Sequence, residues 1–194
     1  MNLRAIFHLI AYVLLVLGLA IICCWGIALY YQDPVPVQHG LALAGVVVLA
    51  AGLLTAWFTR GRIDLSRRDG FGIVSVGWMF EGVFGALPYI FTGTITNPVS
   101  AVFETMSGFT TTGASVLTAL EDFPRGVLFW RAMTHWFGGM GVLVLCVAIL
   151  PFLGVGGMQI YRAEMPGPSK DRLTPRIATT AKFLWGVYVL LCVL

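Results

Sequence analysis

Charged residues are scarce in this chain, at 11% of its 194 residues. A typical soluble domain carries about 25% charged residues, whereas 58% of this sequence is hydrophobic. This composition excludes an ordinary soluble domain and predicts an integral membrane protein.

A strong net charge is also lacking, because twelve Lys and Arg against nine Asp and Glu leave a formal charge of +3. The basic residues fall in short clusters between apolar runs. In a membrane protein such clusters report the orientation of the chain, so we expect no nucleic-acid partner.

Neither cysteine nor histidine forms a motif. Cys23 and Cys24 are adjacent, Cys146 and Cys192 each stand alone in an apolar run, and only three histidines are present. The absence of CxxC and of Cys/His spacing argues against a disulfide framework and a zinc site, and we interpret the cysteines as small buried hydrophobes. Because the apolar runs contain no paired carboxylates and no HExxH, we expect neither an enzyme nor a cofactor.

Long apolar runs are what the sequence has in abundance. They cover residues 5–31, 41–58, 70–91 and 124–152, and a last run starts near residue 177. Each of the first four is long enough to cross a bilayer as a helix. The last run reaches residue 194 without a polar flank, so we expect the N-terminal part of a longer protein.

The charges between these runs predict the orientation. If the spans alternate, one side receives nine basic residues: Arg4, Arg60, Arg62, Arg67, Arg68, Arg162, Lys170, Arg172 and Arg176. The other side receives Asp33 and the mixed charges of residues 104–131. The positive-inside rule then places the N-terminus in the cytosol and residues 92–123 outside.

A short helix is predicted over residues 98–107. Asn97 suits the N-cap, Pro98 the first helical position, and Gly108 the C-terminal stop. Ten residues extend about 15 Å, half the thickness of the hydrocarbon core. Two arrangements fit: an amphipathic helix on the outer surface, or a re-entrant pore helix whose negative end faces the next segment.

The next segment, SGFTTTGASV at residues 107–116, is polar but uncharged. Gly113 supplies conformational freedom, and threonine hydroxyls can supplement backbone carbonyls as oxygen ligands. Such ligands suit a dehydrated monovalent cation, as in carbonyl-lined selectivity filters. The alternative is a secondary transporter in which residues 108–115 form the unwound middle of a broken helix.

Four further polar residues lie in or beside the apolar runs. Glu104 either adds a negative field near an ion or accepts hydrogen bonds from amides behind the filter. Glu81 lies within the third span, where a charge is expensive, so we expect it to have a partner. Arg131 and His135 lie on one face of the fourth span, which favours an anchor at the outer interface.

Three stretches carry a resemblance to a known family: FETMSGFTTTGASVL, FPRGVLFWRAMTHWFGGMGVLVL and LPFLGVGGMQIYRAEMPGPSKDRLTPRIA. They resemble the membrane subunits of bacterial Trk potassium-uptake systems, within the wider Trk/Ktr/HKT family. The resemblance implies a bacterial cytoplasmic-membrane protein whose pore is built from four tandem helix–pore loop–helix units. Each unit contributes one strand to a potassium filter.

Mapped on this chain, the resemblance implies an all-α membrane protein in three parts. Residues 1–62 would be an N-terminal transmembrane hairpin, residues 63–153 the first helix–re-entrant pore loop–helix unit, and residues 154–194 a cytosolic loop and the first helix of a second unit. The filter strand would be 110–115.

The resemblance also assigns residues and partners. Potassium would contact the filter strand, where Gly113 takes the place of the key glycine: Thr110, Thr111, Thr112 and Gly113. Glu104 and Ser115 would support that strand. The implied partners are potassium as transported ion, the lipid bilayer, a cytosolic nucleotide-binding regulatory subunit of the TrkA type, and a second copy of the full-length protein in a homodimer.

Overall fold

The computed structural model describes residues 2–61, 67–153 and 183–190. The chain divides into two compact units, residues 1–136 and residues 137–194. Every regular element of the described residues is helical. The predicted cytosolic loop at 154–176 lies outside the described residues, and of the predicted last span only a helical stretch at 183–190 lies within them.

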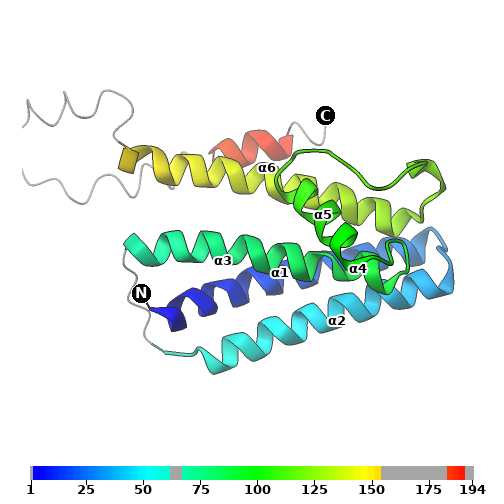
Figure 1. Ribbon diagram of the computed structural model, residues 1–194, viewed down its shortest axis with the longest axis horizontal. Helices are drawn as coiled ribbons and strands as arrows, with labels where there is room; N and C mark the ends of the chain where they lie inside the picture. The colour runs from blue at the N-terminus through cyan, green and yellow to red at the C-terminus, as the bar shows by residue number, and fades with distance from the viewer. Residues whose placement is uncertain (1, 62–66, 154–182, 191–194) are drawn as a thin grey trace, which may run out of the picture. The chain divides into compact units, whose positions relative to one another are not determined.

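The first unit begins with an antiparallel hairpin of two long helices, α1 (Leu3–Tyr30) and α2 (Val35–Phe58) (Figure 1). Asn2 caps α1 by accepting a hydrogen bond from the amide of Ala5. α2 begins earlier than the predicted residue 41. Pro34 forms its N-cap and Pro36 lies in its first turn, where a missing amide removes no helical hydrogen bond.

The predicted third span is broken into α3 (Arg67–Gly85) and α4 (Leu87–Phe91). Pro88 has no amide to donate to the carbonyl four residues earlier, which explains a break at this point. The indole of Trp130 donates to the carbonyl of Gly85 at 3.0 Å. A side chain from a distant helix thus satisfies a backbone acceptor that the break leaves open.

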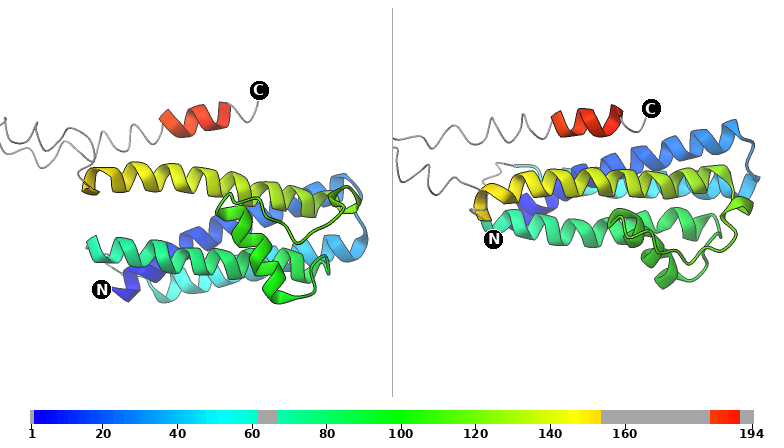
Figure 2. Two further views of the ribbon diagram at one scale, coloured as in Figure 1. Left: turned by 45° about the horizontal axis from the view of Figure 1, so that its top comes forward. Right: turned by 90° about the horizontal axis from the view of Figure 1, so that it is seen from above.

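The helix predicted after Asn97 is present as α5 (Pro98–Phe109), and Asn97 caps it by accepting from the amides of Val99 and Ser100. A short 3-10 turn, η1 (Leu120–Asp122), precedes α6 (Arg125–Leu153). The two views of Figure 2 show α5 crossing the unit at an angle to its long helices. α5 remains far too short to cross a membrane, at roughly 18 Å.

Three segments of the described residues are long and apolar enough to span a bilayer: Leu3–Tyr30, Val35–Phe58 and Gly72–Phe91. α6 has 29 residues, or about 43 Å of helix. Leu19, Val46 and Leu53 are each more than half exposed on α1 and α2, as expected for helix faces in contact with lipid. The structure is therefore that of an all-helical membrane protein.

Candidate functional site

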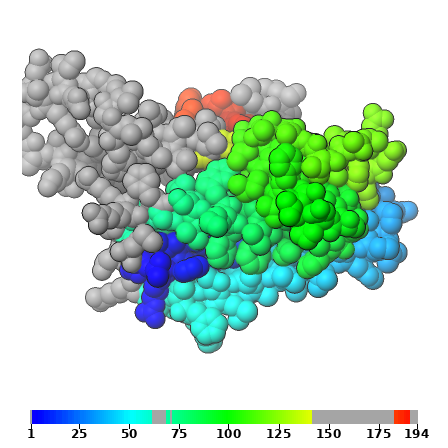
Figure 3. All heavy atoms as spheres, in the orientation of Figure 1, coloured from blue at the N-terminus to red at the C-terminus, as the bar shows by residue number. Residues whose placement is uncertain are grey.

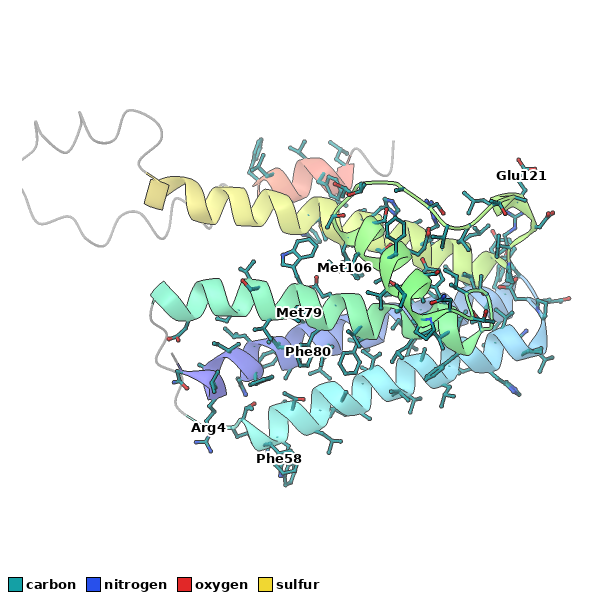
Figure 4. All side chains as sticks on the ribbon, in the orientation of Figure 1. Arg4, Phe58, Met79, Phe80, Met106 and Glu121 are labelled. Atoms are coloured by element: carbon teal, nitrogen blue, oxygen red, sulfur yellow. The ribbon has the colours of Figure 1, made fainter. Side chains whose placement is uncertain are left out.

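The short helix α5 is held against α3 by close contacts at two glycines of α3. A Cβ built on Gly85 would lie 2.7 Å from the Thr105 side chain and 3.0 Å from that of Phe109. A Cβ on Gly82 would lie 2.6 Å from the sulfur of Met106, and Met106 lies between α5 and α3 in Figure 4. Glycine therefore lets the two helices approach closely.

Gly108 corrects one prediction about this helix. It was expected to end the helix, but α5 continues to Phe109 and Thr110 forms the C-cap. A Cβ at Gly108 would overlap the hydroxyl of Thr134 on α6. Glycine is thus required here by packing against α6 rather than by a left-handed stop.

The predicted filter strand turns back along the end of α5. The amides of Thr110, Thr111 and Thr112 donate to the carbonyls of Met106, Gly108 and Ser107 at 2.8, 2.9 and 2.9 Å. These bonds satisfy carbonyls that a helix end leaves open. Within the described residues, the carbonyls of 110–113 themselves accept no hydrogen bond.

Two residues of this strand have left-handed backbone conformations. Gly113 has a φ of +78°, in line with the conformational freedom predicted for a glycine at this position. Thr111 has a φ of +55°. A β-branched residue rarely adopts this conformation, which costs on the order of 1–3 kcal/mol. The hydrogen bond from the Thr111 amide to Gly108 helps to hold the strained turn.

The back of the strand is tied to Glu104, which is 1% exposed. The hydroxyl of Ser115 lies 2.9 and 3.0 Å from the two carboxylate oxygens, and the amide of Val116 donates to Oε2 at 2.9 Å. The predicted hydrogen bond from a backbone amide to Glu104 is therefore present. Ser107 adds a second tie by donating from its hydroxyl to the carbonyl of Ala114 at 2.5 Å.

Arg131 completes this cluster through a contact that the sequence did not predict. Its Nε donates to Oε1 of Glu104 at 2.8 Å and its side chain is 21% exposed, while its role as an anchor at the membrane interface stays a prediction. The pair joins α6 to α5. A sequence signal existed, because two opposite charges in otherwise apolar segments each need a partner.

The front of the strand is open. Residues 110–116 are all exposed, and the green segment that includes them lies on the visible surface of the first unit in Figure 3. The hydroxyls of Thr110 and Thr112 lie 2.8 Å apart within this exposed segment. A strand tied at its back and exposed at its front presents uncharged oxygens to whatever lies opposite.

Two other predicted polar residues lie apart from this cluster. Glu81 is half-buried, and no hydrogen bond or ion pair joins it to another described residue, so its expected partner stays a prediction. His135 donates from Nδ1 to the carbonyl of Arg131 within α6 at 3.0 Å. Neither contacts the residues of the 110–115 strand through an observed hydrogen bond.

Comparison with known proteins identifies the family to which the chain is similar. The family model described as TrkH, cation transport protein, matches residues 39–194. The Trk system potassium uptake protein TrkH of Escherichia coli K12 is 47% identical over 199 residues, which cover all of this chain and 40% of that protein. TrkH of Halomonas elongata is 44% identical, again over all of this chain and 40% of its own length.

A solved structure shares the fold. The crystal structure of the potassium transporter TrkH from Vibrio parahaemolyticus superposes with a TM-score of 0.80 at 35% identity, over 97% of this chain and 37% of that one. The chain thus spans about 40% of the length of the relatives it matches. With a family model covering most of its residues, this multi-pass membrane chain belongs to the TrkH family of cation transport proteins.

Proposed function

We propose that the protein carrying this chain takes up potassium across the bacterial cytoplasmic membrane, and that residues 110–115 form one strand of its selectivity filter. The observation that carries the proposal is the strand's bonding. Its first three amides are tied to the end of α5, while its carbonyls remain open on an exposed face. Open carbonyls can replace the water shell of a monovalent cation.

The ion ligands in this proposal are the carbonyls of Thr110, Thr111, Thr112 and Gly113, supplemented by the threonine hydroxyls. Glu104 and Ser115 would set the position of the strand from behind through their contacts. The negative end of α5 adjoins the strand and favours a cation there. Potassium is the ion transported by the named relatives.

The organisation of the chain follows the same proposal. The hairpin of residues 1–62 precedes a first helix–pore loop–helix unit at 63–153, with α5 as its re-entrant pore helix, and residues 154–194 begin a second unit. One strand cannot surround an ion, so the full-length protein would supply three more.

Substitution of Gly113 by serine tests the central claim. Both Gly113 and Gly93 have positive φ, and a Cβ on either meets no described atom within 4 Å. The two substitutions therefore strain the backbone equally, but only Gly113 lies in the strand. We expect full-length protein with Gly113→Ser to lose its ability to restore growth of a potassium-uptake-deficient bacterium at low potassium, and Gly93→Ser to retain it. Equal rescue by both variants would refute the filter assignment.

Flux measurements separate a filter from a broken-helix transporter. A continuous filter passes ions at rates beyond an alternating-access cycle, with a flux that depends steeply on membrane potential. Slow, saturable turnover with little dependence on voltage would favour a transporter site at residues 108–115.

Partners are proposed on the family relationship and on charge. The N-terminus would lie in the cytosol, where a nucleotide-binding regulatory subunit would dock, and the full-length protein would form a homodimer. The basic segments around Arg60 and at 154–176 would face that subunit. Co-purification of the regulatory subunit with the full-length protein tests this arrangement.

A further inference from the structure

The turn between α1 and α2 caps a helix far away in the sequence. The carboxylate of Asp33 accepts from the amide of Arg125 at 3.1 Å and from that of Gly126 at 2.7 Å. These are the first two residues of α6. Asp33 is only 8% exposed. A negative charge at this position satisfies two open amides and complements the positive end of α6.

The turn that carries Asp33 is itself fixed by hydrogen bonds. The amide of Asp33 donates to the carbonyl of Ala28 at 2.9 Å. The side chain of Gln38 donates to the carbonyl of Asp33 at 2.7 Å. The backbone of Asp33 is therefore held by both helices of the hairpin, which fixes the position from which its carboxylate extends.

Packing also joins the same hairpin to both ends of the segment of residues 92–124, which contains α5. At the far end, a Cβ on Gly126 would lie 2.7 Å from the Ala28 side chain and 2.8 Å from that of Leu41. At the near end, a Cβ on Gly40 of α2 would lie 2.5 Å from the carbonyl oxygen of Phe91, the last residue of α4. In Figures 1 and 2 the turn of the hairpin lies at the same end of the unit as the start of α6.

We propose that the α1–α2 hairpin is a clamp that sets the spacing of the two ends of the pore loop, with Asp33 as a positioning residue for the filter strand. This inference rests on the proposed function of residues 110–115. Asp33 precedes the residues matched by the family model.

A continuous path of contacts links Asp33 to the strand. Asp33 holds the first turn of α6, and Arg131 follows on the same helix about 7.5 Å along its axis. Arg131 pairs with Glu104, and Glu104 holds Ser115 and Val116. A shift of α6 along its axis therefore moves the guanidinium that orients the Glu104 carboxylate.

The test compares two equal charge changes, one in the α1–α2 turn and one in the turn that precedes α6. Asp33→Asn keeps the size of the side chain but removes the charge and one acceptor. Asp122→Asn makes the same change at an exposed residue whose side chain has no hydrogen bond to the described residues. Both variants are made in the full-length protein, and rubidium uptake is measured with the protein content of the membrane.

We expect Asp33→Asn to raise the KM for rubidium roughly fivefold, which corresponds to about 1 kcal/mol of weaker ion binding by a displaced strand, and to lower the discrimination against sodium. Asp122→Asn should match the unsubstituted protein in both respects. A purely structural role would lower the amount of protein and the maximal rate without changing KM or selectivity, and that result would overturn the proposal.

A second variant covers the case in which Asp33→Asn does not accumulate. Gln38→Ala keeps the carboxylate but frees the turn, and we expect a smaller rise in KM in the same direction. An unchanged KM in Gln38→Ala would then refute the clamp.

The unsubstituted protein and the Gly113→Ser variant are measured in the same experiment. If Gly113→Ser abolishes uptake while Asp33→Asn keeps a normal KM and selectivity, the clamp alone is refuted. Absence of uptake by the unsubstituted protein refutes the proposed function and the clamp with it.

Discussion

At the scale of single residues, Glu104 and Arg131 form the contact that joins the candidate filter strand to α6. Glu104 is almost fully buried and Arg131 is partly exposed. Breaking such a pair from one side leaves a buried charge without compensation, which costs more than the pair contributes. Glu104 also accepts hydrogen bonds from Ser115 at the end of the strand and from the amide of Val116 that follows it, so its charge and its acceptor oxygens hold the same part of the chain.

Arg131→Gln should therefore destabilise the full-length protein by about 3 kcal/mol, near the low end for a buried pair because Arg131 is partly exposed. The double variant Glu104→Gln with Arg131→Gln should recover most of this loss, since no buried charge remains. Thermal unfolding in detergent measures the stability of the single and the double variant. Arg125→Gln is the control, because Arg125 is exposed. Glu104→Gln alone should lower potassium uptake. Additive losses in the double variant would contradict the pairing argument.

At the scale of elements, the position of α5 depends on glycines that have no room for a side chain. Gly108→Ala should destabilise the protein by about 1–3 kcal/mol, because the new Cβ meets the Thr134 side chain and both belong to packed helices. Gly77→Ala on α3 is the control, since a Cβ there meets no described atom within 4 Å. We expect thermal unfolding to separate the two variants. A similar loss in both would show that close packing at Thr134 is not special.

Much of α5 and its surroundings was predictable from sequence. The cap at Asn97, the half-span length and the need for glycine at 113 all follow from local residue chemistry. The end of α5 was not predicted correctly, because a glycine at position 108 is locally typical of a helix C-terminus. Its actual role depends on Thr134, which only the folded chain brings close. The Arg131–Glu104 pair was missed for the same reason.

At the scale of the whole molecule, basic side chains lie at one end of the first unit and an acidic side chain lies at the other. Arg4 lies at one end of it with Phe58, and Glu121 lies at the other end beside the start of α6 (Figure 4). Arg60 is close to the first end, where its guanidinium lies 4.8 Å from the centre of the Trp57 ring. Arginine and tryptophan together are typical of a membrane interface.

The orientation proposed from these charges can be measured by thiol labelling of intact cells. Cysteine placed at Asp122 should react with a membrane-impermeant maleimide, and cysteine placed at Arg60 should react only after the cells are permeabilised. Both positions are exposed in the structure, so a difference in labelling reports the side of the membrane rather than burial. The unsubstituted protein is the control, because Cys23 is exposed on α1. Labelling of Arg60→Cys in intact cells, with Asp122→Cys protected, would reverse the topology. It would then place the candidate filter strand at the cytosolic end, where it could not select ions entering from outside.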